Sequence, residues 1–173
     1  MEPATQSKFE SESHPMSLPH LHLMLNHVPM LGVIFGILIL LYARLRNNKD
    51  NMIVGLWMFV IAALLTIPVY LTGDPSESDI RNLPTFSKAM VEEHEDAAVW
   101  AFIMVGALGL AALFGLYLRY KDKKVPKWLP ITVFILSLLT AATFVRTAQL
   151  GGLISHPELR SGFVAPPHQE DHD

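Results

Sequence analysis

The sequence predicts an all-α membrane protein, a four-transmembrane-helix up-down-up-down bundle with both termini extracytoplasmic. Two observations predict it: long uncharged apolar segments, and an uneven distribution of charge among the segments that join them. Of the 173 residues, 51% are hydrophobic, and the mean hydropathy is +0.33. A chain of this length supports one domain. We divide it into a polar N-terminal tail (1–19), a four-helix transmembrane domain (20–156) and a polar C-terminal tail (157–173).

Four segments are long and apolar enough to cross a bilayer. Each approaches the roughly 20 residues that span a hydrocarbon layer of ~30 Å. Backbone polar groups in lipid must bond within their own segment, so these segments are helices rather than strands. The predicted spans are 21–43, 51–73, 97–118 and 128–145, the last continuing past Arg146 to about Leu150.

The charges of the connections predict the orientation. The first and third connections hold eight of the thirteen basic residues and only two acids, so the positive-inside rule makes them cytoplasmic. The second connection, 74–96, carries seven acids against Arg81 and Lys88 and is expected outside with both termini. Residues 1–17 lack the basic start of a secretory signal, so the first helix is expected to act as its own insertion signal. We expect an integral protein of a bacterial-type inner membrane.

Small residues and prolines predict local features of the helices. Gly32 and Gly36 form a GxxxG pair on the first helix, and the third helix is rich in Gly and Ala, which let helix backbones approach closely in lipid. Pro29 and Pro68 each remove a backbone donor near the outer end of a helix, so each is expected to kink or start its helix.

The histidines gather at the outer ends of the predicted helices. Of the eight histidines, His14, His168 and His172 lie in polar tails, and His20 precedes the first helix. Imidazole is the commonest metal ligand in proteins. The candidate ligands, for a cofactor or for a metal ion, are His22, His27, His94 and His156.

The spacing of the first two candidates favours two separate sites. On a regular helix His22 and His27 would point about 140° apart. Each would then be completed by a histidine from another helix, His94 or His156. Pro29 weakens this inference, because the segment before a proline departs from regular helix.

Charged residues near the same end widen the candidate site. Arg146 lies about 27 Å along the fourth helix at ~1.5 Å per residue, near the outer boundary, and intramembrane arginines usually have an anionic partner. That partner is an acid of the second connection, a lipid phosphate or a haem propionate, unless the side chain only extends to the headgroups. The acids around His94 suit a solvated helix start, or a carboxylate–histidine metal site with Glu93, Glu95 or Asp96.

Four motifs in chain order resemble the domain-of-unknown-function 2231 family of small four-helix membrane proteins. The match runs from His22-x4-His27-x-Pro29 through Thr72-Gly73-Asp74 and His94 to Gly151-Gly152 and His156. Two departures are that Asp74 follows Gly73 directly and that Pro157 replaces a glycine after the last histidine. The resemblance implies one or two b-type haems as cofactors, with the four matching histidines as ligands.

Three functions are compatible with these residues. The first is a haem-binding electron-transfer subunit or partner of a respiratory complex, with its haem near the extracytoplasmic surface and Arg146 on a propionate. The second is a metal-ion-binding membrane protein that uses the same histidines. The third is an accessory or assembly subunit without a cofactor. The chain has no cysteine and no framed nucleophile, so electron transfer is favoured over an enzyme by itself. The expected partners are the lipid bilayer and a soluble cytochrome or a larger membrane complex, and no nucleic acid.

Overall fold

A computed structural model describes residues 22, 24–73, 81, 85–162 and 164. Their elements are α2 (His27–Leu45), α3 (Lys49–Leu71), α5 (Lys88–Tyr120), α6 (Trp128–Ser155) and the short 3-10 helix η1 (Pro157–Leu159), with no strand among the described residues. All four α-helices are long and apolar enough to cross a membrane. The predicted N-terminal tail lies outside the described residues.

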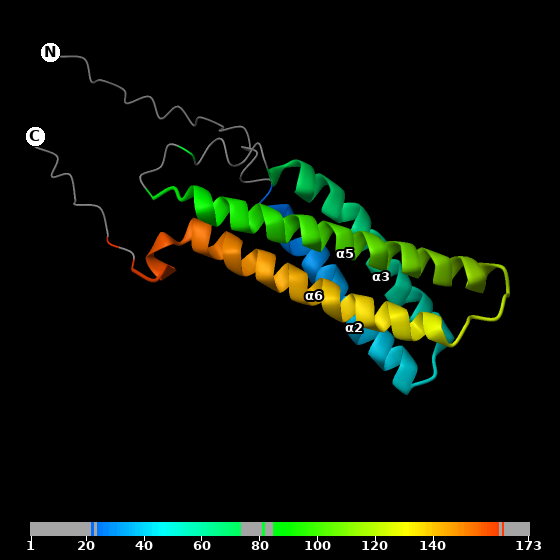
Figure 1. Ribbon diagram of the computed structural model, residues 1–173. Helices are drawn as coiled ribbons and strands as arrows, with labels where there is room; N and C mark the ends of the chain where they lie inside the picture. The colour runs from blue at the N-terminus through cyan, green and yellow to red at the C-terminus, as the bar shows by residue number, and fades with distance from the viewer. Residues whose placement is uncertain (1–21, 23, 74–80, 82–84, 163, 165–173) are drawn as a thin grey trace, which may run out of the picture.

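Consecutive helices are neighbours in the bundle (Figure 1). α2 packs on α3, α3 on α5 and α5 on α6, and a smaller contact between α2 and α6 closes the ring. The chain therefore runs up, down, up and down, which confirms the predicted fold class. We call the end that carries His22, His27, His94 and His156 the histidine end. The opposite end, with the two short basic connections, is the basic end.

Two helices extend further at the histidine end than the sequence predicted. α5 begins at Lys88 rather than 97, and α6 continues to Ser155 rather than about Leu150. At ~1.5 Å per residue, α5 is about 50 Å long, which exceeds a hydrocarbon layer of ~30 Å. A span defined by the absence of charged residues covers only the part of a helix that lies in lipid, so the helix continues beyond it. The acids of 92–96 therefore lie in the first part of α5, which confirms the predicted solvated helix start.

The basic end is closed by two tight turns. Asn48 caps α3, because its Oδ1 accepts hydrogen bonds from the backbone N–H groups of Asp50 and Asn51, each at 3.0 Å. Asn47 and Asp122 adopt φ values of 49° and 50° in the two turns. Asn and Asp are the side chains that tolerate this left-handed region best after glycine.

Both prolines are accommodated within helices near the histidine end. Pro29 lies in the first turn of α2, where backbone N–H groups have no partner within the helix. Pro68 lies inside α3, and its carbonyl accepts the N–H of the C-cap residue Thr72 at 3.1 Å. The last turn of α3 is thus retained beyond the proline.

Glycines set the spacing of the α2–α3 and α3–α5 pairs, as the GxxxG pattern predicted. A Cβ atom at Gly36 would overlap the ring of Phe59, which is fully buried. A Cβ atom at Gly32 would lie 3.3 Å from the Cβ of Ala62. The small residues therefore let side chains of α3 pack directly against the backbone of α2.

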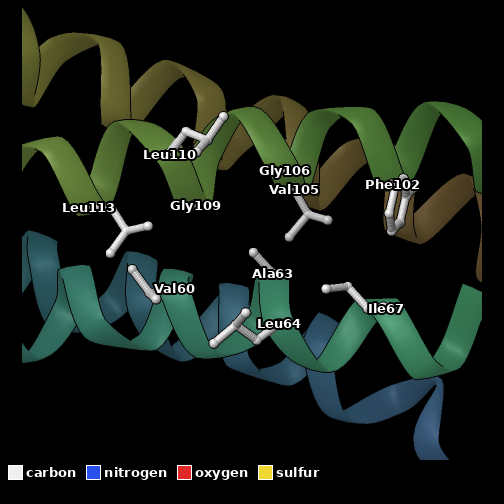
Figure 2. A pocket seen from close by; sticks show the side chains of 10 residues that line it. All are labelled: Val60, Ala63, Leu64, Ile67, Phe102, Val105, Gly106, Gly109, Leu110 and Leu113. Atoms are coloured by element: carbon white, nitrogen blue, oxygen red, sulfur yellow. The ribbon is translucent and has the colours of Figure 1, made fainter.

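The outer surface of the bundle is apolar, as lipid contact requires. A groove of about 230 Å³ runs between α3 and α5. Figure 2 shows its walls, which come from both helices and are entirely apolar. Gly106 of α5 lines the groove, and a Cβ atom added there would have no neighbour within 4 Å.

Replacement of Gly36 by Ala tests the α2–α3 packing. We expect Gly36→Ala to destabilise the bundle by about 1–3 kcal/mol, because Phe59 has no room to move away from the added methyl group. Thermal unfolding in detergent measures the effect. The matched control is Gly106→Ala, where open space and the helix propensity of Ala predict an unchanged or higher midpoint. An unchanged midpoint for Gly36→Ala would contradict the packing described.

Candidate functional site

His22 is bound to the C-terminal end of α3. Its Nδ1–H donates to the carbonyl oxygen of Val69 at 3.1 Å and lies 3.1 Å from Oγ1 of Thr72. Val69 is in the last turn of α3, and its carbonyl also accepts the N–H of Thr72 at 3.3 Å and the Oγ1–H of Thr72 at 3.0 Å. The histidine therefore ties the segment before α2 to the end of α3.

His94 makes the corresponding bond between α5 and α6. Its Nδ1–H donates to the carbonyl oxygen of Thr147 at 3.1 Å. The ring lies against Gly151, where a Cβ atom would approach Cε1 of His94 to 3.2 Å. Gly151 thus makes room for the imidazole, which gives the first glycine of the Gly151-Gly152 motif a structural reason.

These two bonds define the tautomer of both imidazoles. A carbonyl oxygen only accepts hydrogen bonds, so Nδ1 of His22 and Nδ1 of His94 each carry a proton. In a neutral imidazole the other nitrogen, Nε2, then keeps an unshared electron pair. Metal-binding histidines in proteins usually have this arrangement, with one nitrogen held by a second group and the other on the metal.

Both imidazoles lie at the histidine end, within range of an electrostatic interaction. Each is half-buried, and they lie close enough for two imidazolium charges to repel each other. Burial lowers the pKa of His22 below its usual 6.5, against the opposing effect of its bond to the Val69 carbonyl. His22 is therefore neutral at pH 7, the state in which imidazole binds metals.

The other two candidate histidines are placed differently. His27 is the first residue of α2 and is exposed. His156 is the C-cap of α6 and is exposed, with its Nδ1 3.0 Å from Oε1 of Glu158. A turn at Asn26 lies between His22 and the first residue of α2, and its N–H donates to the carbonyl of His22 at 2.9 Å. Of the four, His22 and His94 are half-buried with Nδ1 bonded to a backbone carbonyl, whereas His27 and His156 are exposed.

Arg146 pairs with an acid of α5. Its Nη2 lies 3.5 Å from Oε2 of Glu93, the residue before His94, and both side chains are exposed. An acid of the segment 74–96 was one of the three predicted partners. An exposed pair at this distance contributes little stability, so the guanidinium remains available to another anion.

A carboxylate–histidine metal site is not formed by the part of the chain that the structure describes. No group of three or more His, Asp or Glu side chains there could hold a metal ion. Glu92, the residue before the candidate ligand Glu93, forms an ion pair with Lys88 at 3.2 Å. Among the described residues, the histidine end therefore holds no cluster of mixed histidine and carboxylate ligands.

Sequence reasoning missed Arg160, which joins three segments at this end. Its Nε and Nη2 donate to the carbonyls of Leu153 and Ile154 at 2.7 and 3.1 Å, in the last turn of α6. Its Nη1 donates to the carbonyl of Thr85, before α5, at 2.8 Å. The available signal was a basic residue just after a helix, where it suits the unpaired carbonyls and the negative end of the dipole.

The fold and this site define a class: a membrane protein of four helices with a polar, histidine-containing end. The chain belongs to the family described as "Predicted membrane protein (DUF2231)", whose model matches residues 18–157. The match includes all four helices and His22, His27, His94 and His156, which confirms the family suggested by the motifs. No curated protein and no solved structure was found to match the chain.

Proposed function

We propose that the protein binds one b-type haem through His22 and His94 and transfers electrons at the histidine end of the bundle. The observation that carries the proposal is that two half-buried imidazoles at the histidine end both have their Nδ1–H groups held by backbone carbonyls. Each Nε2 atom is left as a neutral ligand. One haem with two histidine ligands replaces the two separate sites that the sequence spacing favoured.

The donor set suits haem better than a free metal ion. A structural zinc ion takes about four protein ligands, and other metal ions need comparable sets. A haem iron already has four nitrogens from the porphyrin and needs only axial ligands from the protein. Two histidines from different elements meet that requirement, since His22 precedes α2 and His94 belongs to α5.

Each residue of the site has a separate role in this proposal. The Val69 and Thr147 carbonyls fix the imidazole orientations and increase the basicity of each Nε2. Half-burial excludes much of the water, and burial is one of the factors that set a haem potential. Arg146 lies on α6, beside the helix α5 that carries His94. In this proposal its guanidinium gives up the 3.5 Å contact with Glu93 and binds a haem propionate.

The location of the site favours exchange of electrons with a partner outside the lipid. The first three turns of α5 carry Glu92, Glu93, Glu95 and Asp96 around His94. An acidic surface of this kind attracts a basic soluble cytochrome and speeds the encounter. A larger respiratory complex is the other partner consistent with a chain this small.

An accessory subunit without a cofactor is the second candidate. The hydrogen bonds of His22 and His94 to backbone carbonyls favour it, because they connect neighbouring elements whether or not a ligand is present. The apolar groove between α3 and α5, open at Gly106, would suit a partner helix.

Purified protein reconstituted with haem tests the first candidate. We expect a Soret band with the spectrum of a six-coordinate haem. His22→Gln and His94→Gln should each weaken haem binding by more than ~100-fold, beyond the usual loss for a residue that only supports a ligand. Gln keeps an N–H donor for the carbonyl, so the fold is retained. The exposed His27 and His156, changed to Gln, are the controls. No Soret band in the unmodified protein would refute haem binding and favour the accessory subunit.

We also propose that the histidine end is extracytoplasmic, in a bacterial-type inner membrane, because the basic end carries the positive charge that stays inside. The chain has no cysteine, so single cysteines report directly on sidedness. An impermeant maleimide should label Ser87→Cys in intact spheroplasts and label Lys124→Cys only after permeabilisation. The reverse pattern would contradict the orientation.

A further inference from the structure

Two lysines at the basic end lie over tyrosine rings. The ammonium group of Lys121 is 5.6 Å from the centroid of the Tyr120 ring, and that of Lys123 is 5.8 Å from the centroid of the Tyr117 ring. At such distances the negative face of an aromatic ring attracts a cation. Tyrosine is typical of the level of lipid headgroups, where its ring faces apolar chains and its hydroxyl meets water. The two ammonium groups are therefore held at headgroup level instead of extending away from the bilayer.

The positive charge at this end is not balanced by carboxylates of the described residues. The two basic connections hold eight basic residues and two acids. The ion pairs that described residues form with one another lie at the histidine end. Lys121 and Lys123 are exposed, and so is Asp122 between them. An anion at this surface therefore meets cations that no described carboxylate has already paired.

The two tyrosines continue the face of α5 that forms the groove between α3 and α5. Tyr117 is four residues beyond Leu113 and seven beyond Leu110, and Tyr120 is seven beyond Leu113. Residues at this spacing lie on one face of a helix. Leu110 and Leu113 line the groove, and Figure 2 shows Leu113 opposite Val60 of α3 at the end of the groove nearer the basic end. The groove and the two lysine–tyrosine pairs therefore form one surface along α5.

The length of this surface matches a lipid that extends to the middle of the bilayer. The rise from Tyr117 back to Gly106 is about 16 Å at ~1.5 Å per residue, close to half of a hydrocarbon layer of ~30 Å. A lipid whose headgroup lies at Lys121 and Lys123 can therefore place an acyl chain in the groove as far as Gly106. The residues that line the groove are all apolar, as an acyl chain requires.

We propose that this surface binds a phospholipid with an anionic headgroup. Its phosphate accepts hydrogen bonds from the ammonium groups of Lys121 and Lys123, and one acyl chain lies in the groove between α3 and α5. A lysine ammonium has three donors and binds phosphate as a point charge. A zwitterionic lipid has the same phosphate, but the cation of its own headgroup offsets the negative charge.

The two lysines also favour lipid over a helix of another chain as the occupant. An apolar helix would fill the groove and leave both cations without an anion, whereas an anionic lipid satisfies both parts of the surface. The surface lies at the end of the bundle opposite the histidines, so this inference does not depend on haem binding.

Photocrosslinking in vesicles tests the proposal. The purified chain is reconstituted in phosphatidylcholine vesicles with a trace of lipid that carries a diazirine on its acyl chain. This lipid is either anionic phosphatidylglycerol or zwitterionic phosphatidylcholine. Both leaflets contain it, so the result does not depend on the orientation of the protein. Mass spectrometry gives the labelling of α5 at residues 106–113 relative to α2 at residues 28–35. The α2 segment lines a second apolar groove, of about 260 Å³ between α2 and α3, and serves as the internal reference.

We expect the α5-to-α2 ratio to be at least about fivefold higher for phosphatidylglycerol than for phosphatidylcholine, the effect of one basic residue near a membrane surface. The double variant Lys121→Gln/Lys123→Gln should lower the phosphatidylglycerol ratio to that of phosphatidylcholine. The matched control, Lys124→Gln/Lys127→Gln, removes two charges from the same connection and should keep most of the preference. All four lysines are exposed, so both double variants retain the fold.

Three results would overturn the inference. Equal ratios for the two lipids would show that the charge of the headgroup has no effect. An unchanged ratio in Lys121→Gln/Lys123→Gln, or an equal loss in both double variants, would assign the preference to the total charge of the connection and not to a site. Labelling of α2 without labelling of α5 by either lipid would show that a second copy of the chain covers the groove.

Discussion

Carbonyl groups that lack a donor at the ends of helices are the constraint on which the histidine end depends. Within lipid each carbonyl finds its donor in its own helix, and only the last turn of a helix leaves carbonyls without one. Both α3 and α6 end at the histidine end of the bundle. Arg160 satisfies two carbonyls in the last turn of α6, and His22 bonds to a carbonyl in the last turn of α3 that also accepts from Thr72. The side chains that complete these helix ends are also the ones that form the polar site.

The same bonds give the site its chemical character. An imidazole bonded to a carbonyl through Nδ1–H presents an unprotonated Nε2, which is the nitrogen that the proposed function assigns to the cofactor. His94 reaches the same state by a second bond to a carbonyl within α6, and Gly151 provides the space for its ring. The extension of α5 and α6 beyond the lipid is what allows this, because it brings His94 and Thr147 opposite each other on two packed helices.

Much of the fold could be predicted from the sequence, because the bilayer restricts it so strongly. Uncharged segments of the required length identified the four long helices that the structure describes, and the orientation inferred from the charges of the connections stays a prediction. The bounds were wrong where helices leave the lipid, since Glu92 to Asp96 are as acceptable on a solvated helix as in a loop. Of the four candidate histidines, sequence position alone did not distinguish the half-buried His94 from the exposed His156. That distinction depends on the packing of α5 against α6, which no local pattern records.

Two residues of the histidine end had no recognisable signal before the fold was known. Arg160 follows η1 and was one basic residue in a polar tail, until its three carbonyl partners, two in α6 and one before α5, became visible. Asn26 lies within the family motif between His22 and His27. Only the fold shows that its Oδ1 is buried without a hydrogen bond among the described residues. Both are properties of tertiary structure, since each depends on what a side chain meets outside its own segment.

The most direct test of this account is the tautomer of His22 and His94 in the ligand-free protein. Nuclear magnetic resonance of protein labelled with nitrogen-15 at histidine, in detergent near pH 8, distinguishes a protonated Nδ1 from a protonated Nε2. His22→Gln and His94→Gln assign the two signals. The account predicts that both residues carry the proton on Nδ1, because a carbonyl oxygen accepts it there. A proton on Nε2 of either residue would contradict the account, since that nitrogen would then not be available as a ligand.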